Sequence, residues 1–106
     1  MKVVIQVSEK EKIPMGNIVG THIAVLKDVE TVEVVFLESA IIATTHEDMI
    51  KPLLEDKKII VMACRTSMEM NNIKETDLVK GVSATPMGGF IEIVRRQQEG
   101  WYYIHV

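Results

Sequence analysis

The chain has 106 residues, with 12 basic and 15 acidic side chains and a formal net charge of −3. A chain of this length forms a single domain, residues 1–106, that buries roughly two-thirds of the surface of its unfolded state. The lack of a basic surplus, with only one Trp, two Tyr and two Phe, argues against binding nucleic acid through phosphate neutralisation or base stacking.

Five short apolar runs follow one another along the chain, at residues 3–7, 32–37, 59–63, 82–84 and 101–104. Their nearly continuous apolar character is typical of strands that are buried on both faces. None approaches the length of about 18 residues that a membrane span requires, and the first is far shorter than a signal sequence. We therefore expect a soluble protein without membrane partners.

Stretches with the apolar spacing of helices lie between these strands. The residues that define the expected buried faces are Met15, Ile18, Val19, Ile23 and Leu26, then Met49, Ile50, Leu53 and Leu54, then Phe90, Ile91 and Val94. Alternating strands and helices imply right-handed crossovers. This order predicts an α/β fold, a three-layer α/β/α sandwich of flavodoxin-like appearance around a mainly parallel five-stranded sheet.

Local signals predict where two of these helices begin and end. A helix that begins at Asp48 places Pro52 among its first residues, where a missing N–H costs little. Thr85 has the character of an N-cap, with Pro86 at the first helical position, and Gly100 is expected to end the same helix.

The only cysteine, Cys64, directly follows the third predicted strand. Loops after the carboxyl ends of parallel strands form the ligand crevice of open α/β sheets, so Cys64 is a candidate site residue. Thr66 and Glu69 have the spacing of a capping box, which predicts a short helix from Thr66 onward. The positive end of that helix and Arg65 would both stabilise negative charge on the sulfur. The residues leave open whether Cys64 is a reactive thiol or a packed, inert side chain.

One unpaired cysteine is typical of a reducing, cytoplasmic compartment, and it cannot form an intramolecular disulfide. The three histidines offer it no obvious partner. His22 falls on the apolar face of the first predicted helix, as a hydrogen-bonded core residue, while His46 is expected in solvent and His105 is penultimate. We predict neither a metal site nor a Cys–His pair.

The segment T-P-M-G-G, residues 85–89, is the second informative stretch. Two glycines at the start of a predicted helix serve either the close approach of a ligand or thiol-bound sulfur to backbone N–H groups, or close packing of the helix on the sheet. The sequence contains neither a dinucleotide fingerprint nor a phosphate-binding loop, so no nucleotide cofactor is predicted.

Short segments spread over nearly the whole chain carry a resemblance to a known family. They are residues 1–5, 34–36, 39–40, 63–64, 67–68, 77–78, 81–82, 86 and 88, and the ending Q-Q-E-G-W-Y-Y-I at 97–104. In these segments the chain resembles the DsrE/DsrF-like proteins, which are related to sulfur-relay subunits of bacterial sulfur oxidation and tRNA thiolation.

The resemblance implies a three-layer domain that forms homo-oligomers, with Cys64 at the mouth of a small pocket. In relay members the matching cysteine holds sulfane sulfur as a persulfide and hands it to a partner protein. The chain departs from many relatives in two places. They have a glycine at or near Glu38 and Ser39, and a small polar residue near Arg65 and Thr66, so the charges here change what the pocket mouth would bind.

These expectations describe a cytoplasmic, sulfurtransferase-like persulfide carrier with Cys64 as its nucleophile. It would need no cofactor or metal, and its partners would be further copies of itself and the donors and acceptors of sulfur. The residues expected around the site are Arg65, Thr66, Ser67, Ser8, Ser39, Met87 and Gly88. The alternative is a non-catalytic oligomeric module whose crevice binds a small ligand or partner peptide while the thiol stays passive.

Overall fold

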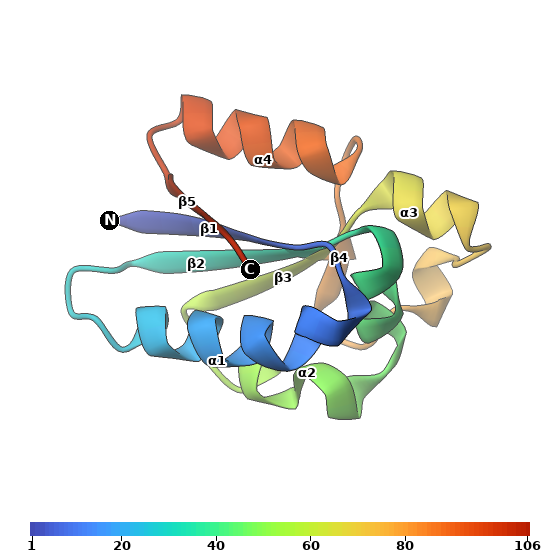
Figure 1. Ribbon diagram of the computed structural model, residues 1–106, viewed down its shortest axis with the longest axis horizontal. Coiled ribbons are helices and arrows are strands. Elements are labelled where there is room, and N and C mark those ends of the chain that lie inside the picture. The colour runs from blue at the N-terminus through green and yellow to red at the C-terminus, as the bar shows by residue number, and fades with distance from the viewer.

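The computed structural model describes all 106 residues as a parallel sheet between two layers of helices (Figure 1). The strands are β1 (Lys2–Val7), β2 (Thr31–Phe36), β3 (Ile59–Ala63), β4 (Val82–Ala84) and β5 (Tyr102–His105). They lie in the order β4-β3-β2-β1-β5, and every neighbouring pair is parallel. The predicted three-layer α/β/α fold is confirmed, with a sheet that is wholly rather than mainly parallel.

One face of the sheet is covered by α1 (Ile13–Ala24) and α2 (Glu47–Leu54), and the other by α3 (Arg65–Met70) and α4 (Gly89–Gln98) (Figure 1). Short 3₁₀ helices occur at η1 (Lys10–Lys12), η2 (Glu38–Thr45) and η3 (Glu75–Asp77). The longest helix has 12 residues, and none has both the length and the apolar character needed to cross a bilayer.

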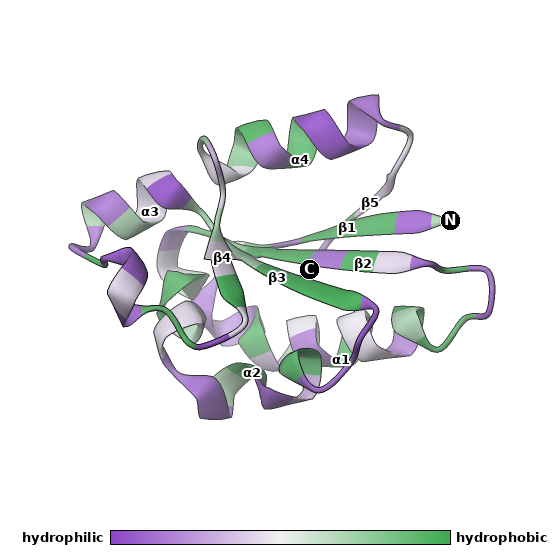
Figure 2. Ribbon diagram, turned by 180° about the vertical axis from the view of Figure 1, so that it is seen from behind, coloured by the Kyte–Doolittle hydropathy of each residue, from purple (hydrophilic) through white to green (hydrophobic).

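Strand β2 shows how the sheet separates two hydrophobic cores. Val34 and Phe36 belong to the core under α1 and α2, whereas Val35 and the following Leu37 belong to the core under α3 and α4. Successive side chains of a strand point to opposite faces, so a strand covered on both sides is apolar along its length. Figure 2 shows this contrast between the hydrophobic central strands and the more hydrophilic helices.

Helix α1 turns only part of the face that its apolar spacing predicts toward the sheet. Its fully buried residues are Ile13, Gly16, Gly20 and Ala24. Of the predicted face, Val19 and Ile23 pack against the core, whereas Met15, Ile18 and, beyond the helix, Leu26 are exposed. The glycines decide this orientation because they allow close packing. A Cβ on Gly16 would lie 2.8 Å from Val7 Cγ2, and one on Gly20 would lie 2.9 Å from Leu53 Cδ2. The expectation of a buried His22 is also wrong, since its side chain is exposed.

Helix α2 begins at Glu47, one residue earlier than predicted, and it is kinked at Ile50. The kink lies two residues before Pro52, which cannot donate a hydrogen bond to the preceding turn. Pro52 therefore sits in the first turn after the kink, where a missing N–H leaves no helical bond unmade. His46 precedes the helix and is exposed, as predicted.

Helix α4 differs most from the prediction, because it begins at Gly89 rather than Pro86 and buries its polar side. Its inward residues include Glu92 and Ile93, while Phe90, Ile91 and Val94 are 55%, 40% and 53% exposed. The predicted end at Gly100 is confirmed. Gly100 has a φ of +92°, its N–H donates to the carbonyl of Gln97, and the next N–H donates to that of Arg96.

Candidate functional site

Cys64 lies where the connections of two neighbouring strands diverge. Strand β2 leads to α2, whose Leu53 packs in one core, whereas β3 leads to α3, whose Met68 packs in the other. Such a divergence opens a crevice at the carboxyl edge of a parallel sheet. The N–H of Cys64 donates to the carbonyl of Phe36 at 2.9 Å, which extends the pairing of β2 and β3 to the edge of this crevice.

The sulfur of Cys64 accepts two backbone hydrogen bonds, from Gly89 N–H at 3.1 Å and from Ser67 N–H at 3.4 Å. The second bond makes Cys64 the N-cap of α3, which therefore begins at Arg65. The predicted start at Thr66 is wrong by one residue because the sulfur already provides the cap. Only 3% of Cys64 is exposed, so both donors act on a sulfur that is largely shielded from water.

Gly89 is the first residue of α4, and its lack of a side chain permits the contact with Cys64. A Cβ at this position would lie 2.9 Å from Cys64 Cβ and 3.1 Å from the sulfur. The sequence suggested two roles for the glycines, close packing of the helix and access of sulfur to a backbone N–H, and this single contact serves both. The helix packs closely on the strand end, and the same approach brings its N–H to the sulfur.

Thr85 explains why α4 does not start where the sequence suggests. Its side chain is fully buried, and its hydroxyl accepts a hydrogen bond from Arg65 N–H at 3.1 Å and donates one to the carbonyl of Met87. The hydroxyl thus joins the start of α3 to the segment before α4. Residues 85–88 form a loop that presents Gly89 to the sulfur.

A cavity of about 290 Å³ adjoins the sulfur. Its wall includes Cys64, Ser67 and Gly89 together with the apolar side chains of Leu37, Met70 and Phe90. Thr66 and Gly88, both predicted as site residues, also line it. The volume suits a small molecule or the tip of a side chain, at the lower end of the range for ligand pockets.

Glu38 brings a carboxylate to this cavity, at a position that the sequence marked only as a departure from the resembling family and not as a site residue. Its φ of +51° is uncommon for a residue with a side chain and costs about 1 kcal/mol. The N–H of Glu38 donates to Ser67 Oγ at 2.8 Å, which holds this conformation. The available signal in the sequence was the position of Glu38 just after β2, because the carboxyl ends of neighbouring parallel strands meet at the same edge of the sheet as Cys64.

Other predicted site residues lie away from the cavity. The guanidinium of Arg65 donates to the carbonyl of Thr85 at 2.8 Å and lies 3.5 Å from a carboxylate oxygen of Glu75. Met87 lines a neighbouring surface depression with Pro86 and Arg95. Ser8 and Ser39 form their own group, since Ser39 Oγ donates to the carbonyl of Ser8 and accepts from the N–H of Lys10.

A buried group of charged residues holds α4 on the sheet one turn beyond the cavity. Arg96 Nε lies 3.2 Å from a carboxylate oxygen of Glu33 on β2 and 3.1 Å from one of Glu92. Glu33 is only 1% exposed, and its second oxygen has no hydrogen-bond partner. Burial, reinforced by the neighbouring Glu92, raises the pKa of Glu33 to about 8, although Arg96 opposes the shift.

Comparison with known proteins identifies the fold. No family model matches the sequence, and no curated protein matches it significantly. Three solved structures share the fold over nearly the full length of both chains. MTH1491 from Methanobacterium thermoautotrophicum, a protein of unknown function, is 25% identical, with a TM-score of 0.80 and coverage of 99% of this chain and 98% of that one.

The other two structures are more distant in sequence. BT1422 from Bacteroides thetaiotaomicron, also of unknown function, is 16% identical, with a TM-score of 0.73 and coverage of 99% and 94%. The ychN protein from E. coli is 12% identical, with a TM-score of 0.69 and coverage of 100% of both chains. The chain is thus a small α/β protein of an architecture found in several organisms, and the likeness itself carries no activity.

Proposed function

We propose that this protein is a cytoplasmic persulfide carrier of the DsrE/DsrF-like kind, with Cys64 as the residue that accepts and releases sulfur. The observation that carries the proposal is the position of the Cys64 sulfur, which faces two backbone N–H donors at the wall of a cavity. Backbone N–H groups at the start of a helix favour an anion, and both a thiolate and a persulfide are anions.

The proposed reaction is an exchange of sulfane sulfur between thiols. The Cys64 thiolate attacks the outer sulfur of a donor persulfide, R–S–SH, and forms a new S–S bond. The S–S bond of the donor breaks, its electron pair leaves on the thiolate R–S⁻, and the proton stays with the transferred sulfur. An acceptor thiolate then attacks the outer sulfur on Cys64 in the same way, so the exchange consumes no oxidant or reductant.

The cavity gives the outer sulfur of such a persulfide a place next to Cys64. Leu37 and Phe90 on its wall are apolar, which limits the access of water to a group that reacts readily with other thiols. Glu38 adds negative charge at the same cavity, so it opposes strongly anionic donors and favours neutral or cationic ones. The proposed donors and acceptors are small sulfur species or other proteins.

We also propose that the surface beside this cavity is covered by another protein chain. Met70 is 79% exposed, and it lines the cavity together with Phe90 and Ile91 of the outward apolar side of α4. Exposed methionine and aromatic residues at one cavity are typical of surfaces that adapt to a partner. Further copies of the chain and the acceptor protein are the proposed partners.

A second candidate function follows from the N-cap that Cys64 provides for α3. A sulfur that is 3% exposed and bonded to two N–H groups also satisfies a purely structural requirement. In this case the protein is a binding module, and the cavity holds a small ligand or partner peptide while the thiol stays passive.

Mass spectrometry after incubation with a cysteine desulfurase and cysteine, which together supply a protein-bound persulfide, distinguishes the two functions. We expect the wild-type protein to gain the mass of one or more sulfur atoms at Cys64. Dithiothreitol should remove this sulfur, and an added acceptor thiol protein should collect it. Iodoacetamide should alkylate Cys64 in the folded protein, because a carrier thiol must be reachable.

Two variants control the experiment. Cys64→Ser keeps a side chain that caps helices well, so it should fold normally and acquire no sulfur. Adding Ser39→Cys to this variant places the only thiol at the neighbouring strand end, outside the cavity, where sulfur should accumulate more slowly. A wild-type protein that stays unmodified, or that is alkylated only after denaturation, would establish the passive thiol instead.

A further inference from the structure

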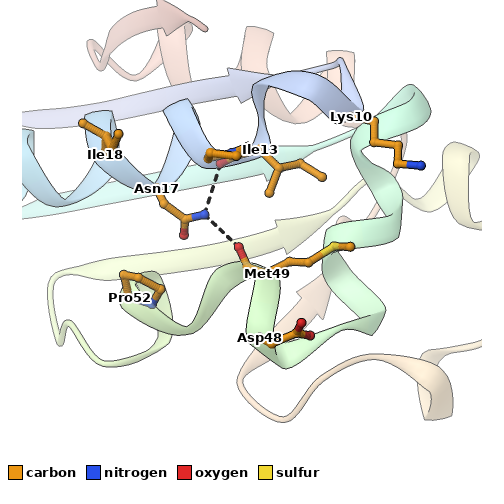
Figure 3. A pocket seen from close by; sticks show the side chains of 8 residues that line it. Lys10, Ile13, Asn17, Ile18, Asp48, Met49 and Pro52 are labelled. Atoms are coloured by element: carbon orange, nitrogen blue, oxygen red, sulfur yellow. Dashed lines mark hydrogen bonds between the residues drawn. The ribbon is translucent and has the colours of Figure 1, made fainter.

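The largest cavity of the protein lies on the opposite side of the sheet from Cys64. It is a groove of about 520 Å³ between α1 and α2, with Lys10 of η1 at one end (Figure 3). Its wall is mainly apolar and includes Ile13, Ile18, Met49 and Pro52. A volume of this size is within the range of small-molecule pockets, whereas the other two cavities are about 210 and 290 Å³.

Asn17 lines this groove, and its side chain carries a buried polar atom that has no partner. The side-chain N–H groups of Asn17 donate to the carbonyl of Met49 at 2.7 Å and to that of Ile13 at 3.1 Å. These two bonds fix the amide, so its oxygen points away from them toward the α2 side of the groove (Figure 3). This oxygen is one of only two buried side-chain polar atoms in the chain without a hydrogen bond.

The charges around the groove indicate what kind of molecule would fit. Asp48 lies on the α2 edge, and neither Asp48 nor Lys10 forms an ion pair within the chain. The unpartnered oxygen of Asn17 can only accept a hydrogen bond, and so can the carboxylate of Asp48. A protonated amine donates to both kinds of group, and its apolar body would cover Ile18 and Met49.

We infer that the groove between α1 and α2 is a binding site for a small aromatic or aliphatic amine in its protonated form. The inference is independent of Cys64, which belongs to the opposite core. It accounts for two features that the proposed sulfur chemistry leaves unused, the unsatisfied amide oxygen of Asn17 and the exposed apolar side chain of Ile18 at the wall of the groove.

Three probes with the same ring test the charge requirement. They are tryptamine, which is a cation, tryptophol, which is neutral, and indole-3-acetate, which is an anion. In ¹⁵N-correlation spectra, tryptamine should shift the side-chain amide of Asn17 and the backbone amides around Ile18 and Met49. A ligand of this size should have a dissociation constant of about 1 mM. Tryptophol should bind about threefold more weakly, and indole-3-acetate more weakly still.

Paired variants locate the site. Asp48→Asn should weaken tryptamine about threefold and leave tryptophol unchanged, whereas Glu47→Gln, the same change on the neighbouring residue, should alter neither. Ile18→Lys should weaken both probes about tenfold, because it removes apolar surface and adds a positive charge. Met15→Lys is the matched control, since Met15 is equally exposed on the same helix but does not line the groove.

Several results would overturn the inference. One is equal affinity for the three probes, and another is an affinity that Ile18→Lys leaves unchanged. Shifts confined to α4 would show that the exposed side chain of Phe90, and not the groove, attracts the ring. No shift at the Asn17 amide at saturating tryptamine would mean that its oxygen receives no donor from the ligand.

Discussion

The buried carboxyl group of Glu33 makes a specific prediction about how stability depends on pH. Its pKa is about 8 in the folded protein and 4.5 in its ordinary state. The folded protein therefore holds this proton over a pH range in which the unfolded chain has released it. The sign follows directly: the free energy of unfolding falls as pH rises from about 4.5 to about 8, and this contribution is constant above that range.

The separation of the two pKa values sets the magnitude. Each pH unit between them is worth 1.36 kcal/mol, so a separation of roughly 3.5 units lowers the free energy of unfolding by about 5 kcal/mol. Such a loss is comparable to the whole stability of many small domains. Glu33→Gln keeps the shape of the protonated side chain but cannot ionise. The variant should be the more stable protein at pH 9 and should resemble the wild type at pH 5.

Urea denaturation at several pH values between 5 and 9 measures this difference. Glu92→Gln is the informative second variant, because it removes one cause of the raised pKa and leaves Arg96 with Glu33. Its loss of stability with pH should be smaller than that of the wild type. Parallel stability curves for the wild type and Glu33→Gln would show that Glu33 does not titrate in this range and would refute the reasoning.

Three further changes test the surroundings of Cys64. In urea denaturation, Gly89→Ala should lower the free energy of unfolding by about 1–2 kcal/mol, because the added Cβ would lie 2.9 Å from Cys64 Cβ. Gly88→Ala is the matched control and should cost less than about 0.5 kcal/mol, because its Cβ would approach the movable hydroxyl of Thr66 at 3.0 Å. Thr85→Val should cost about 1–3 kcal/mol by the same measurement, since it leaves Arg65 N–H without its acceptor, and Thr85→Ser should restore most of the loss. Light scattering should show an oligomer for the wild type and a smaller species for Phe90→Glu, and a wild-type monomer at micromolar concentration would contradict self-association through α4.

The strands were predictable from the sequence because their signal is local. Residues 59–63 and 82–84 form strands with the expected bounds, and the other three strands differ by one residue at one or both ends. A run of apolar, largely β-branched residues has few alternatives to a strand buried on both faces. The strand ends also identified the position of Cys64 at the crevice, since the edge of a parallel sheet follows from strand order alone.

Apolar spacing predicted the buried face of α2, since Ile50 and Leu53 lie in the core, but it did not predict the orientation of α1 and α4. For α1 the decisive residues are Gly16 and Gly20, which count for little in a hydrophobic pattern but permit the closest packing. For α4 the decisive residue is Glu33, which is far away in the sequence. Glu33 interrupts the apolar run of β2, but nothing in the sequence identified Glu92 and Arg96 as its partners.

The same long-range contact accounts for the surface next to Cys64. Glu33 is buried on the face of the sheet that α4 covers, so the helix must turn a polar side inward to provide Arg96. The apolar side of α4 then faces outward, and it places Phe90 and Ile91 at the wall of the cavity beside the sulfur. At the first residue of the same helix, Gly89 donates its N–H to that sulfur. A helix held by the buried carboxyl group of Glu33 therefore supplies both the anion-stabilising donor and the exposed apolar surface that the proposed transfer of sulfur to a partner requires.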